Sequence, residues 1–394
     1  MTERTHGVVS MHFADGSSID TWQSLTMRET YTDPLGELTF ETTPPARFIA
    51  DYRARLAKGE LVTVLVNGVN QGVFLIQTCN RKHGKRGSTF SITCHTPLVT
   101  PYQSSIDQAL VKKTPTDVPL TETILQSLGP YGFQTIIADT AASVSTVSGK
   151  PIDGRAPAVS LPALKHNESH PQQGETAYQY IARLITRLGC CLRMAPDGTL
   201  LVGKPDYDQP PVYTLIRTLS GKAGPGDYFV GDVDVVDTND GQHSEAQVRG
   251  QSNDTADATQ TNLPVARVQE NLLHPGRPSY RSPIAAPYKP KNVKDKGSRD
   301  RATATSTAKL ELGLQAAKAF YITGTVDGFV SVTGRIWSVD TIAHVVIEQE
   351  DIAEDMWIAE RVLTLSRGGG EGDGEHTRLK LLPKGALVLG DVPS

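Results

Sequence analysis

Alternating apolar and polar positions dominate the first hundred residues. The segments GVVSMHF, GELTFET, ELVTVLVNG and STFSITCHT each alternate with the period of two that a half-buried strand requires. Turn-forming pairs such as Asp15-Gly16 separate them, and only residues 45–58 interrupt the series with helical spacing. Six or so short strands predict a small barrel or sandwich, and we assign residues 1–100 to a first β-barrel domain.

The pattern changes after this first series of strands. Residues 115–128 have the polar start and apolar spacing of a short helix, and the strand-like segment FQTIIAD follows them. Residues 140–173 are rich in Ser, Ala, Pro and His and show no period. We expect residues 101–205 to form an α/β domain that ends in a helix-hairpin unit.

The helix-hairpin unit has the clearest local pattern in the chain. Apolar residues from Ala177 to Leu188 recur at the three-and-four spacing of one helical face. Gly189 can adopt the left-handed conformation that ends a helix, and a strand pattern begins directly after it. Asp197 and Gly198 then favour a tight turn into a second strand. We predict that Gly189, Asp197 and Gly198 are critical for the fold of this unit.

Strand patterns return in two separated segments, residues 206–252 and 318–394, which predict a second, split β-barrel domain. Residues 253–317 lie between them and are predicted to form an extended, Pro-rich, basic arm followed by a helix. A segment of this length is a linker, an extended arm or a functional loop. Its Pro-rich, basic composition favours protein docking over binding of nucleic acid. The residues predicted to dock a partner are Arg277, Tyr280, Tyr288, Lys289, Lys291 and Lys294.

These patterns together predict the fold class. The chain is expected to be mainly β with α+β parts, built from two small β-barrel domains and an α/β insertion domain. A length of 394 residues is consistent with several domains of ordinary size.

The charge balance removes some classes of function. Lys and Arg number 39 and Asp and Glu number 43, so the net charge of -4 gives no bulk attraction to nucleic acid or to an anionic membrane. The sequence also lacks an apolar run long enough to span a bilayer and the apolar core of a signal peptide. We therefore expect a soluble protein that is made in the cytosol.

Four cysteines are too few for a disulfide framework in a chain of this length. The adjacent Cys190 and Cys191 fall on a predicted strand and therefore point to opposite faces, which favours scaffold packing over shared binding of a metal. Cys79 and Cys94 are expected to face each other only if their hairpin turns at Arg86-Gly87. We expect free thiols.

Three stretches resemble chemical motifs and are better explained as structure. The histidines of HNESH, residues 166–170, are four apart, but flanking prolines oppose the helix that would aim both at one metal. The acidic segment DVDVVDTNDG lacks the order of a calcium loop, and GGGEGDG lacks the Lys-Ser/Thr of a phosphate-binding loop. We predict no catalytic residue, no metal and no cofactor.

Three longer stretches have a distinctive order along the chain. They are the N-terminal β-domain that ends in GVFLIQTCN and STFSITCHT, the segment ETAYQYIARLITRLGCCLRMAPDGTLLVGKP, and a C-terminal run. That run reads DGFVSVTGRIWSVDTIAHVVIEQEDIAEDMWIAERVLTLSRGGGEGDGEHTRLKLLPKGAL. Together these stretches resemble the hub proteins at the centre of contractile phage baseplates of the Mu-like tail type. The length and basic charge of residues 253–301 depart from the family pattern.

The resemblance implies a homotrimer whose two related β-barrels per chain alternate around a ring with pseudo-sixfold symmetry. The implied partners are the tail tube or tube-initiator protein, the central spike protein, neighbouring baseplate wedge proteins and the tape-measure protein. The implied location is the tail baseplate of the virion, with no membrane partner and with synthesis and assembly in the host cytoplasm. Two alternatives stay open, a hub of a related tailocin or secretion spike and a tail-associated cell-wall hydrolase.

Overall fold

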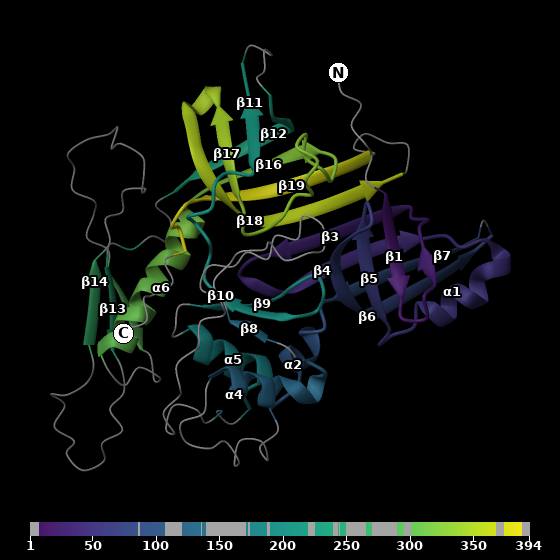
Figure 1. Cartoon of the computed structure of the whole chain (residues 1–394), viewed down its shortest axis with the longest axis horizontal. Helices are drawn as coiled ribbons and strands as arrows, with labels where there is room; N and C mark the ends of the chain where they lie inside the picture. Colours follow the sequence, from purple (N-terminus) through teal and green to yellow (C-terminus); the bar gives the residue numbers. More distant parts are fainter. Residues whose placement is uncertain are drawn as a thin grey trace.

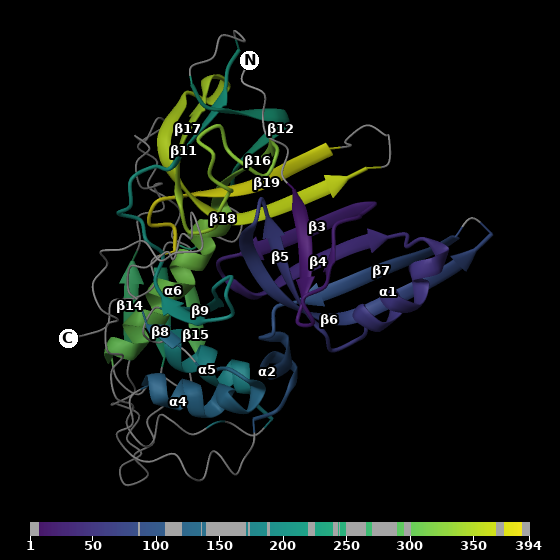
Figure 2. The same cartoon turned by 45° about the vertical axis from the view of Figure 1, so that its right-hand side comes forward.

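The structure is a computed structural model that describes residues 8–85, 87–106, 120–134, 136–138, 171, 174–186, 190–219, 225–238, 243, 245–249, 265–269, 290–294, 301–367 and 374–387. Figure 1 shows two groups of β-strands side by side, with a helical group below them and a smaller helix-and-strand group beside it. Figure 2 shows the same four groups from a second direction.

The first unit is an antiparallel sheet that curls around its own core. Its strand order is β2-β1-β5-β6-β7-β4-β3. Buried and less buried residues alternate along the strands, as the period of two predicts, so one face packs inward. Its elements are β1 (Val9–Phe13), β2 (Ser18–Ile19), β3 (Ser24–Thr30), β4 (Asp33–Thr42), a 3-10 turn η1 (Ala46–Phe48), α1 (Ile49–Arg55), β5 (Leu61–Val66), β6 (Val69–Gly84) and β7 (Gly87–His95).

The second β-unit is a closed barrel of six strands. The ladders run β17-β11-β12-β16-β19-β18, and β18 pairs again with β17 to complete the circle. Two of its ladders, β11 with β12 and β11 with β17, are parallel. The elements are β11 (Tyr213–Arg217), β12 (Asp227–Asp237), β16 (Phe320–Asp327), β17 (Ile342–Ile347), the 3-10 turn η5 (Glu348–Glu350), β18 (Ile352–Ser366) and β19 (Gly374–Pro383).

One long strand belongs to both β-units. The first part of β18 pairs with β17, whereas its last seven residues pair with β3, from Glu360 opposite Thr30 to Ser366 opposite Ser24. Leu363 and Leu365 of this strand are buried in the core of the first unit. The two units are therefore joined in one 13-stranded sheet.

The α/β unit lies below the two β-units in Figure 1. The apolar helical face that the sequence predicts from residue 177 onward is buried, including Ala177, Ile181 and Leu184. Strand β8 pairs in parallel with β10, and β9 pairs with β10 as the predicted hairpin. Its elements are α2 (Val99–Gln103), α4 (Leu120–Leu128), the 3-10 turn η2 (Gly129–Tyr131), β8 (Ile136–Ala138), α5 (Ala177–Thr186), β9 (Cys191–Met194) and β10 (Leu200–Gly203).

The fourth group combines a helix with three short strands. The helix α6 (Arg301–Ala319) packs on the sheet β14-β13-β15, made of β13 (Glu245–Arg249), β14 (Val265–Gln269) and β15 (Pro290–Lys294). Thus β13 pairs with strands of the segment predicted as an extended arm, whereas the sequence pattern placed it with the barrel strands.

The predicted fold class is confirmed. The chain is mainly β, with a closed six-stranded barrel, a second β-unit and additional α/β elements. Among the described residues, no helix is both long and apolar enough to cross a bilayer.

Candidate functional site

The residues with the most unusual environment lie where the two β-units meet the α/β unit. Two arginines lie there, Arg361 on β18, which is buried, and Arg193 on β9, whose side chain is 16% exposed. A buried guanidinium is stable only when carboxylates and hydrogen-bond acceptors surround it, because removing its charge from water is costly. The partners of these arginines therefore show what holds the units together.

Arg193 connects the α/β unit to both β-units. Its Nη2 donates to Oδ2 of Asp340 at 2.9 Å, and the Asp340 side chain is fully buried. The guanidinium also lies over the ring of Tyr31 from the first unit, 4.9 Å from the ring centroid. The Tyr31 ring in turn packs edge-on against Trp357 of the barrel. One side chain thus contacts all three units.

Asp340 accepts further hydrogen bonds that compensate for its burial. Oδ1 accepts from the backbone N of Asp206 at 3.2 Å and from Nε1 of Trp357 at 2.9 Å. Burial raises the pKa of Asp340, and the charge of Arg193 opposes that shift. The residue has a positive φ of 64°, a conformation that Asp tolerates better than most side chains.

Arg361 performs the corresponding role between the two β-units. Its Nε donates to Oε2 of Glu29 on β3 at 2.8 Å, and its Nη1 donates to Oε1 of Gln71 on β6 at 2.9 Å. Nη1 also donates to the carbonyl of Trp337 in the barrel. The side chain is 4% exposed, so these bonds are largely shielded from water.

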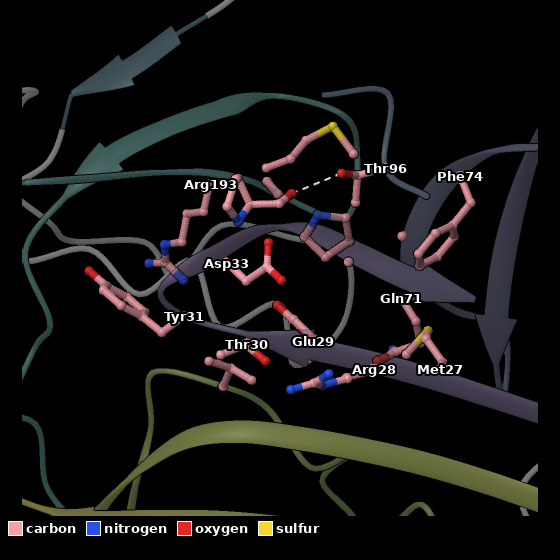
Figure 3. Close-up of a pocket in the computed structure, with 17 residues that line it drawn as sticks. Met27, Arg28, Glu29, Thr30, Tyr31, Asp33, Gln71, Phe74, Thr96 and Arg193 are labelled. Atoms are coloured by element: carbon pink, nitrogen blue, oxygen red, sulfur yellow. Dashed lines mark hydrogen bonds between the residues drawn. The ribbon is translucent and has the colours of Figure 1, made fainter. Parts of the chain in front are cut away.

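A small pocket beside this junction is lined by the first unit and by the β9 turn (Figure 3). Tyr31 and Arg193 lie together on one side of it, and Phe74 lies on the other. The Thr96 hydroxyl donates to the carbonyl of Pro34 at 2.8 Å, which ties β4 to the segment after β7. The cavity volume is only ≈ 40 Å³, which suits a few water molecules and not a substrate. The junction is built to fix the units, and its geometry does not indicate catalysis.

The structure places two of the three turn residues of the helix-hairpin unit. Asp197 Oδ1 accepts from the backbone N of Thr199 at 2.9 Å, and Gly198 has a φ of 90°, which favours glycine. Asn70 of the first unit donates from Nδ2 to the carbonyl of Pro196 at 2.9 Å, so this turn also contacts its neighbour. Gly189 lies outside the described residues, and the importance of all three turn residues for folding stays a prediction.

The predicted docking residues are described only in part. Lys291 on β15 donates to Oε2 of Glu311 on α6 at 2.6 Å, so its charge has a partner within the chain. Lys294 ends β15, where its backbone pairs with Arg249. Arg277, Tyr280, Tyr288 and Lys289 lie outside the described residues, as does the HNESH segment, and docking by the arm stays a prediction.

The adjacent cysteines Cys190 and Cys191 pack into different cores, as strand alternation predicts. Cys190 is buried in the core of the α/β unit, whereas Cys191 packs against the cluster that contains Trp357. Cys79 and Cys94 do not face each other, because the hairpin pairs Gly84 with Gly87 and so does not turn at Arg86-Gly87. Cys79 therefore lies opposite Ile92, and Cys94 lies opposite Ile76.

Thiol chemistry provides a first prediction. Burial raises the pKa of Cys190 to about 11 and the pKa values of Cys94 and Cys191 to about 12. A raised pKa keeps the thiol protonated at pH 8, and only the thiolate reacts rapidly. We expect iodoacetamide at pH 8 to modify the half-buried Cys79 first and the other three at least ~100-fold more slowly than in the unfolded chain.

Peptide mass spectrometry after timed alkylation measures this order, and the same reaction in urea is the control in which all four should react alike. Modification of Cys191 in the folded protein at the rate of Cys79 would contradict the assignment of Cys191 to a closed core.

The sequence analysis missed the arginine junction. Arg361 was detectable in principle, because Glu360-Arg361 interrupts the apolar strand MWIAERVLTLS where solvated charge is not expected. Arg193 alternates with Leu192 along the strand pattern, and nothing in that pattern indicates a partner. Its partner, Asp340, lies 147 positions away, and no local pattern connects them.

Metal binding by a side-chain cluster has no support within the described part of the chain. No group of three or more His, Cys, Asp or Glu side chains there is placed to hold a metal ion. A half-exposed pair, His344 Nδ1 with Asp355 Oδ1 at 2.9 Å, lies on the barrel strands β17 and β18.

No protein-family model and no curated protein sequence matches the chain. Solved structures do match over nearly its full length. A tail protein from Neisseria meningitidis MC58 has 20% sequence identity and a TM-score of 0.73, covering 99% of this chain and 100% of that chain. The 43 kDa tail protein of prophage MuSo2 from Shewanella oneidensis has 16% identity and a TM-score of 0.70, covering 97% and 99%.

A more distant match is an E. coli component of the type VI secretion system, described as structurally similar to the bacteriophage T4 tail proteins gp27 and gp5. It has 7% identity and a TM-score of 0.52, and the match covers 98% of this chain and 79% of that chain. The chain therefore has a fold that is shared by phage tail proteins and by a component of the type VI secretion system.

Proposed function

We propose that the chain is the structural hub of a contractile phage tail baseplate. Three copies form a ring in which the two β-units of each chain alternate, so that six similar surfaces face a hexameric tail tube and three face a trimeric spike. The observation that carries this proposal is the similarity to two phage tail proteins over at least 97% of this chain.

The joined sheet supports this role physically. An adaptor must transmit force between its partners, so its modules must not rotate freely about a linker. Here the ladder between β3 and β18, together with Arg193 and Arg361, fixes the two β-units. A head-to-tail contact repeated around an axis then closes a ring if the rotation for each copy is 120°.

The same plan serves related particles, and the match to a type VI secretion component supports a hub of a tailocin or secretion spike as the second candidate. In either particle the proposed partners are a tube protein, a spike protein, neighbouring baseplate proteins and the tape-measure protein.

Light scattering of the purified chain tests the proposal. We expect a mass of three times 42.5 kDa, or a monomer that becomes a trimer when its spike protein is added. Binding to the tube protein and to the spike protein, each measured separately by co-elution, completes the test. A chain that stays monomeric and binds neither protein would exclude the hub.

A further inference from the structure

The barrel is closed by its ladders, but one of its strands has an unpaired edge. Strand β12 pairs with β11 only through Asp227 and Tyr228, and its register with β16 shifts between Val230 and Val233. From residue 232 to 236, β16 is the only strand that pairs with β12 in the described part of the chain. Backbone groups on the other edge are therefore available to a further strand.

The side chains along this edge are acidic. Asp232 and Asp234 are exposed, and they line a hollow of ≈ 690 Å³. The other charged residues that line it are Glu350, Arg217 and Arg378. Arg217 closes the near end of the edge by donating to the carbonyl of Gly231 at 2.7 Å. The hollow is large enough for an extended segment. The exposed carboxylates of Asp232 and Asp234 on β12 itself favour a basic one.

A second unpaired edge belongs to the first unit and is basic. Strand β5 accompanies β6 only as far as Leu75, with the adjacent Gly59 and Glu60 still bonded to Ile76. Beyond Ile76, β6 pairs only with β7 among the described residues, so its other edge is unpaired. The exposed residues at this end of the hairpin are Arg81, Lys82, His83, Gly84 and Lys85.

The two edges lie on opposite parts of the molecule. In the barrel order, β12 is three strands away from β18 in either direction, and β18 carries the contact with the first unit. In Figures 1 and 2, the far end of the β6–β7 hairpin points away from both the barrel and β12. One copy cannot join its own two edges without separating the β3–β18 ladder.

We propose that the basic edge of β6, residues 78–84, pairs as an added strand with the acidic edge of β12, residues 232–236, in the next copy of this chain. The proposal rests on the trimeric hub proposed above and names the surfaces that close its ring. Each first unit then contacts its own barrel through β3 and β18 and the next copy's barrel through β6 and β12.

Charge selects this pairing over the alternatives. Two β12 edges would bring Asp232 and Asp234 against their own copies, and two β6 edges would do the same with Lys82 and Arg81. Like charges directly opposite each other on paired strands are destabilising, whereas opposite charges stabilise the pair. The contact is therefore head-to-tail, the type that generates a ring.

Charge reversal tests the contact. The variant Lys82→Glu with Lys85→Glu, and separately the variant Asp232→Lys with Asp234→Lys, should each raise the dissociation constant of the trimer by at least ~100-fold. The variant that carries all four changes restores opposite charges at every contact and should form trimers again. Arg53→Glu with Lys58→Glu reverses two exposed charges on and beside α1 and is the matched control, which should leave the mass unchanged.

Cross-linking provides a second measurement on the unaltered chain. A carbodiimide joins an amine to a carboxylate that touches it, so a trimer should give a peptide linking Lys82 or Lys85 to Asp232 or Asp234. Mixing ¹⁵N-labelled and unlabelled chains before cross-linking shows whether the two joined peptides come from different copies of the chain. We expect the mixed-label product, and its yield should fall as salt is raised.

The outcomes separate the two proposals. A wild-type trimer that yields no such link, and whose reversed variants stay trimeric, would disprove this contact and leave the hub intact. A wild-type chain that never assembles with itself, tube or spike would overturn the hub and this contact with it.

Discussion

Replacing Asp340 with asparagine is expected to lower the free energy of unfolding by about 3–5 kcal/mol. Asparagine keeps the shape of the side chain and tolerates the positive φ, so the change removes little except the negative charge. The guanidinium of Arg193 would then remain buried without its carboxylate, since Asp340 Oδ2 is its partner at 2.9 Å. Urea unfolding should show the transition at a lower urea concentration than in the wild type. Tryptophan fluorescence is a suitable signal, because Trp357 donates a hydrogen bond to the same carboxylate.

The double variant Arg193→Met with Asp340→Asn distinguishes loss of the pair from loss of shape. Removing both charges leaves no uncompensated ion, and such replacements are commonly neutral or stabilising. The double variant should therefore recover more than half of the unfolding free energy that Asp340→Asn loses. Asp355→Ala is a control at a half-exposed ion pair, where a change within about 1 kcal/mol is expected. An Asp340→Asn protein that unfolds at the wild-type urea concentration would refute the role given to this pair.

Replacing Arg361 with alanine is expected to cost about 2–4 kcal/mol and to separate the unfolding of the two β-units. The buried carbonyl of Trp337 loses its donor, and the links to Glu29 and Gln71 disappear together. Differential scanning calorimetry should then resolve two transitions in place of one cooperative transition.

Arg28→Ala is the matched control for this variant. Arg28 lies on β3 and pairs with Glu360 at 3.1 Å, but its side chain is 52% exposed, so the expected effect is less than about 1 kcal/mol. If both alanine variants shift the melting temperature equally, the importance assigned to burial of Arg361 is wrong.

The local structure of the chain could be predicted well from its sequence. The three-and-four spacing identified the buried face of α5, and strand alternation predicted the separate environments of Cys190 and Cys191. These features depend on neighbouring residues and on turn chemistry, which the sequence displays directly.

The contacts between units could not be predicted in this way. Strand β18 shows an apolar pattern that fits any sheet, and nothing local indicates that its second half pairs with β3, more than 300 positions earlier. The same limit applies to Arg193, whose strand face is polar in pattern but is covered by the barrel. The Cys79 and Cys94 register was missed because the hairpin pairs Gly84 with Gly87, and a turn displaced by one residue changes the partner of every residue along both strands.

The sharing of β18 between the units has a consequence for how the protein is made. Strand β3 ends at Thr30, but the strand that covers its edge begins at Ile352, so nearly the whole chain must leave the ribosome before the first unit is finished. Leu363 and Leu365 also enter the core of that unit only at this late stage. A truncated product would therefore carry an incomplete core in the first unit and an uncovered strand edge, which favour proteolysis and aggregation.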